Sequence, residues 1–169
     1  AFGLLGLAEF ERGLYLRPDN LAGGVAGVRA RLASLCPQSD LTVFVARDLG
    51  PARERDALGL WDGAGLNQAY AERTDRLDQW LAGAGALPLD EAARESLVMG
   101  HDAIHALVFD PLLPEPMVNT TARAAFADAV RRFDAAGQLI WQQFLAGSRR
   151  TPPSGPAAAQ LATPHPADL

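Results

Sequence analysis

Residues 101–114, HDAIHALVFDPLLP, predict the corner around which the C-terminal half of the chain is organised. One histidine and three apolar residues recur in steps of four, three and four, and so share one helical face: Leu97, His101, Ile104 and Val108. Pro111 disfavours helical dihedrals at the residue before it, so we expect this helix to end near Phe109. The segment therefore predicts a rigid turn between two long helices, with His101 as the polar residue on an otherwise apolar helix face.

Helical periodicity continues on both sides of this corner. We expect a short helix over 53–60, a longer one over 66–82, and a third from residue 91, capped by Asp90, to Phe109. The last helix should begin near Asn119 or Thr120. Its expected buried stripe is Phe126, Val130, Phe133, Ile140, Trp141 and Phe144. From Gly147 the sequence becomes rich in Pro, Ala, Gly and Ser, which is typical of a disordered tail.

The N-terminal fifty residues predict strands over 2–7 and 13–17, a helix over 21–35 capped by Asp19 or Asn20, and a buried strand over 41–46. This order matches the later part of a ferredoxin-like sandwich whose first strand and helix are absent. The predicted fold class is therefore α+β, a truncated ferredoxin-like sandwich followed by an all-helical domain. The expected domains are 1–50 and 51–146, with a tail over 147–169.

Composition limits the classes of partner. The chain has 15 basic residues, all arginine, and 20 acidic residues, so a net charge of −5 argues against tight DNA binding by these residues alone. The single cysteine, Cys36, cannot form an internal disulfide and fits a reducing cytoplasm. No apolar run is long enough to span a membrane. We therefore expect a cytoplasmic protein with no membrane partner.

His101, Asp102 and His105 are the residues that would carry metal chemistry. His101 and His105 are one helical turn apart, a spacing at which two imidazoles can share a metal, but no further ligands are evident from the sequence. A histidine hydrogen-bonded within a core or pocket is the alternative. The sequence shows neither a nucleophile elbow nor a glycine-rich phosphate loop. We expect no enzyme activity and no cofactor, and keep a metal-dependent enzyme or metal-binding module as the alternative.

Arg17, Asp19 and Asn20 lie where the second predicted strand ends and the first helix begins. A guanidinium beside a helix N-terminus suits an anionic ligand group such as a phosphate or carboxylate. An arginine paired with a neighbouring acid, in a purely structural role, explains the same residues equally well.

Several of these segments resemble one family. The segment GLYLRPDNL over 13–21, the tripeptide LWD over 60–62 and the turn DPLLP over 110–114 resemble the PaaX-type transcriptional regulators, which repress phenylacetate degradation. The resemblance covers residues from about 1 to 146. It departs at Phe109, where the family usually has arginine, and at Ile104 and His105, which replace Arg or Tyr-Arg pairs.

The resemblance implies an effector-sensing and dimerisation part of a repressor. In that family a winged helix binds DNA, a ferredoxin-like domain follows, and aryl-CoA thioesters such as phenylacetyl-CoA release the DNA. It implies a homodimer that senses an aryl- or acyl-CoA thioester between its halves and reaches DNA only through an N-terminal domain absent from this chain. The residues expected to bind the effector are Arg17, Asp19, Asn20, Trp61, His101 and Asp110. A purely structural dimerisation module is a further alternative.

Overall fold

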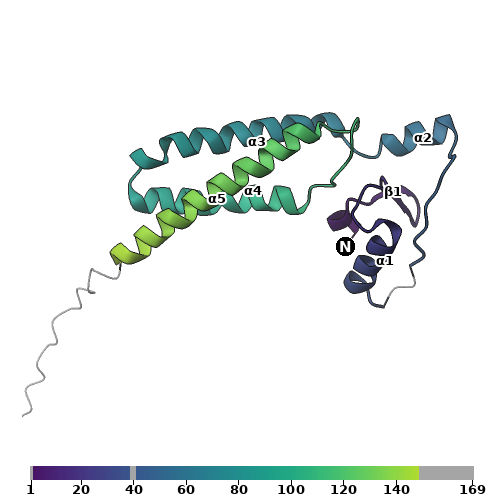
Figure 1. The fold of residues 1–169 in the computed structure, drawn as a ribbon, viewed down its shortest axis with the longest axis horizontal. Helices are drawn as coiled ribbons and strands as arrows, with labels where there is room; N and C mark the ends of the chain where they lie inside the picture. Colours follow the sequence, from purple (N-terminus) through teal and green to yellow (C-terminus); the bar gives the residue numbers. More distant parts are fainter. Residues whose placement is uncertain (1, 39–40, 149–169) are drawn as a thin grey trace, which may run out of the picture.

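The computed structural model describes residues 2–38 and 41–148. A small N-terminal unit lies beside one end of three long helices, and the short helix α2 links the two parts (Figure 1). The elements are η1 (Phe2–Leu5), β1 (Ala8–Glu11), β2 (Leu14–Leu16), α1 (Gly24–Leu35), α2 (Pro51–Leu58), α3 (Gly63–Gly83), η2 (Ala84–Ala86), α4 (Leu89–Val108) and α5 (Thr120–Ser148). The tail predicted from residue 147 lies almost entirely outside the described residues.

The second predicted N-terminal strand is confirmed, but its antiparallel partner begins only after residues 2–7, where the first strand was expected. Strands β1 and β2 pair antiparallel, with Ala8 opposite Leu16 and an irregularity between Glu9 and Glu11. Residues 2–5, expected to be strand, form the 3₁₀ helix η1 instead. Gly6 explains the shift, because its φ of +66° turns the chain between η1 and β1.

The ferredoxin-like sandwich is not confirmed, and its expected third strand is absent. Within the described ranges the sheet has only β1 and β2. Residues 41–46 form no strand, and Phe44 is 61% exposed. Only Val43 of this run packs against the small N-terminal core of Leu5, Val28 and Leu32. An apolar run becomes a strand only where a neighbour pairs with its backbone, and no described segment does so here.

Helix α1 starts three residues later than expected. Its N-cap is Gly23, with a φ of +88°, and not Asp19 or Asn20. The left-handed conformation at this position is one that glycine adopts without steric cost, so the Gly23-Gly24 pair determines where the helix begins.

The predicted long helices are confirmed. Asp62 caps α3 by accepting a hydrogen bond from the Gly65 backbone N–H at 2.8 Å. Asn119 caps α5 by accepting one from Ala122 at 2.9 Å. Asp90 does not cap α4; it lies inside the first turn, where a carboxylate interacts favourably with the helix dipole.

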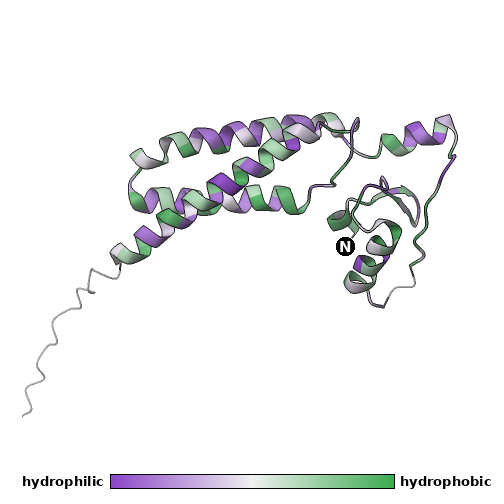
Figure 2. Cartoon of the chain, in the orientation of Figure 1, coloured by the Kyte–Doolittle hydropathy of each residue, from purple (hydrophilic) through white to green (hydrophobic). Residues whose placement is uncertain are grey.

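Helix α5 holds the bundle together. It crosses α3 and α4 diagonally and packs against both, whereas α3 and α4 contact each other little (Figure 1). Apolar and polar turns alternate along all three helices (Figure 2). The buried residues that form the core are Tyr70, Leu77, Trp80, Ala103, Leu113, Val118, Phe126, Ala129, Val130 and Phe133. The predicted α5 stripe is thus buried as far as Phe133, and Ile140 packs against its end.

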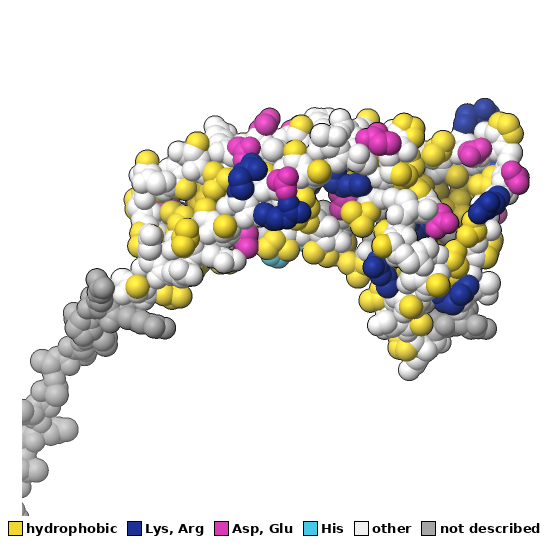
Figure 3. All heavy atoms as spheres, in the orientation of Figure 1, with side chains coloured by type: hydrophobic (Ala, Val, Ile, Leu, Met, Phe, Trp, Pro, Cys, Tyr) yellow, Lys and Arg dark blue, Asp and Glu magenta, His cyan; other side chains and the backbone are white. Residues whose placement is uncertain are grey.

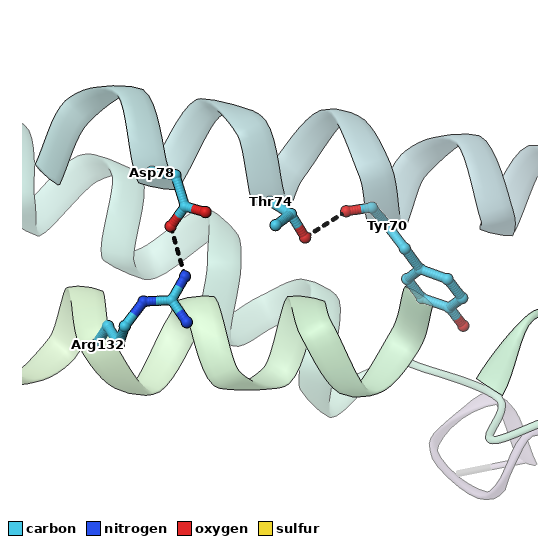
Figure 4. A network of polar contacts seen from close by, with 4 residues as sticks. All are labelled: Tyr70, Thr74, Asp78 and Arg132. Atoms are coloured by element: carbon cyan, nitrogen blue, oxygen red, sulfur yellow. Dashed lines mark hydrogen bonds and ion pairs between the residues drawn. The ribbon is translucent and has the colours of Figure 1, made fainter. Parts of the chain in front are cut away.

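An ion pair joins α3 to α5 at the edge of this core, and a hydrogen bond within α3 lies near it. Arg132 of α5 donates to the Asp78 carboxylate at 2.6 Å, and the Thr74 hydroxyl donates to the Tyr70 backbone carbonyl at 2.7 Å (Figure 4). The Arg132–Asp78 pair is about half exposed, so it contributes little stability and mainly fixes the register of the two helices.

The face of α4 that is buried is not the predicted one. The buried residues of this helix are Ala92, Ala93, Ser96 and Ala103. The expected apolar face points outward. Leu97 is 61% exposed, and His101 is exposed and forms no hydrogen bond with the described residues. Small side chains let α5 approach closely, since a Cβ on Gly137 would lie 3.6 Å from the Cβ of Ser96. Helix α4 therefore turns its small residues toward α5, because they allow close packing, and its larger apolar residues remain exposed.

Candidate functional site

Arg17 is held in place by neighbouring oxygens. Its Nε donates to the Pro18 carbonyl at 3.0 Å, one terminal nitrogen to the Leu5 carbonyl, and the other to Asn20 Oδ1 at 2.9 Å. Burial, with a smaller contribution from Arg31, lowers the pKa of this guanidinium. Because all three nitrogens already donate, the structure favours a structural role for Arg17 over anion binding. Asp19 is exposed beside it.

Asn20 connects the N-terminal unit to the Asp-Pro corner. Its Nδ2 donates to the Leu112 carbonyl at 2.6 Å. Gly6 packs on the same corner so closely that a Cβ there would lie 2.5 Å from the Pro111 carbonyl oxygen. The structure therefore brings together residues 17–20 and 110–112, two segments that the family resemblance assigns to one effector site.

Asp110 is the buried anchor of this corner. It is 7% exposed; one carboxylate oxygen accepts from the Tyr70 hydroxyl and the other from the Leu112 backbone N–H, both at 2.7 Å. Burial, and then the hydrogen bond to Asp110, raise the pKa of Tyr70 far above its ordinary value. Leu112 has a φ of +53°, a strained conformation that the bonds from Asp110 and Asn20 hold in place. Both carboxylate oxygens of Asp110 are thus used in folding.

Trp61 and His101 take no part in the hydrogen bonds that the structure describes at this corner. Trp61 is half-buried against the edge of the bundle core, just before α3. His101 lies on the outer face of α4, with its ring centroid 6.4 Å from that of His105. Within residues 2–38 and 41–148, no group of three or more His, Cys, Asp or Glu side chains is placed to hold a metal.

A groove of about 320 Å³ lies between α3 and α4, where these helices are not packed together. Its lining combines apolar side chains with arginine, histidine and aspartate: Arg73, Arg76, Leu77, Met99, Asp102, Ala103, His105 and Ala106. The volume is at the lower end of the range for ligand-binding pockets. The groove is thus a concave site that the described fold offers to a small molecule.

The arginines of the groove are free to bind a ligand. Arg73 and Arg76 lie on successive turns of α3, are exposed, and form no ion pair or hydrogen bond with any residue that the structure describes. Asp102 faces the same groove, and His105 packs its ring against Phe109 with centroids 4.4 Å apart. Two arginines and one aspartate give the lining one more positive than negative side chain. Such a lining suits an anionic group attached to an apolar body.

Residues 61–143, which contain α3, α4, the corner and most of α5, match the family model described as the PaaX-like protein C-terminal domain. Over these residues the chain is similar to a PaaX-like C-terminal domain. The resemblance found in the sequence is thereby confirmed for these residues, and PaaX-family proteins are transcriptional regulators. The chain matches no curated protein and no solved structure. None of the described helices is both long and apolar enough to cross a membrane.

Sequence reasoning singled out neither of the two groove arginines, Arg73 and Arg76. Their spacing of three residues, which puts two guanidiniums on one face of α3, was the available signal. The groove itself has no signature in the sequence, because it depends on the gap that the diagonal α5 leaves between α3 and α4.

Proposed function

We propose that this chain is the effector-sensing and dimerisation part of a PaaX-like transcriptional repressor, and that its effector, an aryl- or acyl-CoA thioester, binds in the groove between α3 and α4. The proposal rests on Arg73 and Arg76, two arginines that form no ion pair with the described residues and that line the groove beside apolar side chains. DNA would be contacted by a domain outside residues 1–169, because the net charge of −5 is unfavourable for a nucleic-acid backbone.

The chemistry of a CoA thioester matches both parts of the groove. Its phosphates need cationic donors, which Arg73 and Arg76 supply, and its acyl or aryl group needs an apolar surface, which Leu77, Met99 and Ala106 supply. A groove of about 320 Å³ would hold one end of the ligand and leave the remainder outside the bundle.

Ligand binding would act on DNA affinity by changing the relation of α3 to α4. A ligand that bridges these two helices binds more tightly to one spacing of them than to another, and it shifts the equilibrium by that difference in affinity. The corner after α4 contacts the N-terminal unit through Leu112 and Pro111, so a movement of α4 would reach that unit. Asn20 and Asp110 then have a role in transmission, alongside their role in folding.

Calorimetric titration of the chain with phenylacetyl-CoA and acetyl-CoA tests this proposal. Arg73→Ala and Arg76→Ala should each weaken binding about tenfold, the effect of losing one charge-assisted contact. Arg131→Ala is the matched control, since Arg131 is exposed on α5 and pairs only with Asp128. Equal affinities for all three variants, or no heat with either thioester, would contradict the proposal.

A further inference from the structure

Helix α4 presents an uncovered apolar stripe to solvent, which we call the α4 stripe: Leu97, His101, Ile104 and Val108. Its apolar members are 61%, 50% and 52% exposed in that order. Val98, Phe109 and Leu112, which are 56%, 48% and 44% exposed, border it. Apolar side chains that recur on one face of a helix are normally buried, so the stripe requires an explanation.

The bundle cannot cover this stripe itself. One side of α4 packs on α5, where a Cβ on Gly100 would lie 3.4 Å from the Phe133 ring. A second side, with Met99 and Ala106, faces α3 across the groove. The α4 stripe occupies the third side of the helix. In the space-filling view a histidine side chain lies among apolar atoms at the lower edge of the bundle (Figure 3).

We propose that a second copy of this chain covers the α4 stripe, with the two α4 helices antiparallel. The residues of the α4 stripe are spaced by four, three and four positions, and this order is the same when the helix is followed in either direction. A two-fold axis midway between His101 and Ile104 therefore places Leu97 against Val108 of the second copy, and His101 against Ile104 of the second copy. An isologous interface requires such a self-complementary pattern, whereas an unrelated partner does not.

The charge of Arg94 favours the antiparallel orientation. No charged residue interrupts the stripe between Leu97 and Val108, and Arg94 precedes it on the same face. An antiparallel pair places Arg94 near the C-terminal carbonyls of the other α4, where a cation is stabilised. A parallel pair would bring the two Arg94 side chains together. One helix face is smaller than a standard interface, so the dimer is a weak, reversible one.

This inference rests on the homodimer of the proposed function and names its surface, but it does not depend on ligand binding. Sedimentation equilibrium of the chain should show a monomer–dimer equilibrium. Ile104→Glu should raise the dissociation constant about tenfold or more, because it buries a charged carboxylate at the centre of the contact, opposite the His101 imidazole. Leu139→Glu is the control, since Leu139 is 60% exposed on α5, away from the stripe. Circular dichroism should show both variants folded.

Cysteine crosslinking tests the orientation. In a Cys36→Ser background, mixed Leu97→Cys and Val108→Cys chains should form a disulfide-linked dimer under mild oxidation, and Leu97→Cys alone should not. Crosslinking of Leu97→Cys alone to the same extent would overturn the antiparallel arrangement. If Ile104→Glu does not weaken the dimer, or if Leu139→Glu weakens it equally, the α4 stripe is not the dimer interface. The homodimer itself would not be contradicted. A monomeric chain would overturn both. Ile104→Glu should leave thioester affinity unchanged, so failure here is separable from failure of the sensor proposal.

Discussion

At the scale of single residues, the Tyr70–Asp110 hydrogen bond is a buried polar contact whose removal should destabilise the corner. Both side chains are buried, at 2% and 7% exposed, and the bond is 2.7 Å long. Tyr70→Phe keeps the ring against Phe126 but leaves one carboxylate oxygen of Asp110 buried without its donor. We expect a loss of about 1–3 kcal/mol in the free energy of unfolding, measured by urea denaturation.

Tyr15→Phe provides the matched control for that substitution. Tyr15 stacks on Phe2 with ring centroids 4.3 Å apart, and its hydroxyl bonds to none of the described residues. Removing that hydroxyl should change stability by less than about 0.5 kcal/mol. If the two variants unfold at the same urea concentration, the hydrogen bond does not stabilise the corner.

At the scale of the element, the first turn of α5 has two side-chain caps that differ in charge. Asn119 accepts from the Ala122 N–H, and Glu115 accepts from the Thr120 N–H at 2.8 Å. The bonds from the Thr120 backbone and hydroxyl lower the pKa of Glu115 below its usual 4.5. Its contribution to stability is therefore complete above pH 4.5 and is lost as the pH falls through the lowered pKa.

This sign predicts a pH-dependent difference in melting temperature. Wild type should melt above Glu115→Ala at neutral pH, and the difference should shrink as the pH falls below 4.5. Asn119→Ala, at the same helix end, should lose about 0.5–2 kcal/mol at every pH because its cap does not titrate. Parallel curves for wild type and Glu115→Ala would refute the assigned role of Glu115.

At the scale of the whole molecule, Gly6 decides how closely the N-terminal unit approaches the helices. A Cβ at Gly6 would lie 2.5 Å from the Pro111 carbonyl oxygen, and the residue has a φ of +66°. Gly13 has a φ of +80° but no neighbour within 4 Å of such a Cβ. Gly6→Ala therefore adds a clash to the conformational strain that both alanine variants share.

The paired glycine variants test the packing of the two parts. Gly6→Ala should cost about 1–3 kcal/mol more than Gly13→Ala and should speed hydrogen exchange in α1 around Val28 and Leu32. Exchange measured by mass spectrometry reports on α1 directly. Equal exchange in the two variants would show that contact with Pro111 does not stabilise the N-terminal unit.

Local sequence determined much of the helical part. Periodic apolar residues and the Asn119 cap predicted α3, α4 and α5, and Pro111 predicted the end of α4, because these signals act within a few residues of chain. The second strand of the hairpin was predicted for the same reason, whereas the first was expected over 2–7 and lies at Ala8–Glu11. The expected strand over 41–46 failed, since a strand needs a partner that local sequence cannot supply.

Tertiary structure alone decided which sides of the helices became surface, groove and core. From the sequence we expected the stripe that contains Leu97 and Val108 to be buried. Helix α5 instead packs on the small residues of α4, such as Ser96 and Gly100, and the stripe is exposed to solvent. The candidate site followed from the same packing. Arg73 and Arg76 line a groove only because α5 bridges α3 and α4 without closing the gap between them, and the width of such a gap is set by contacts between residues far apart in the chain.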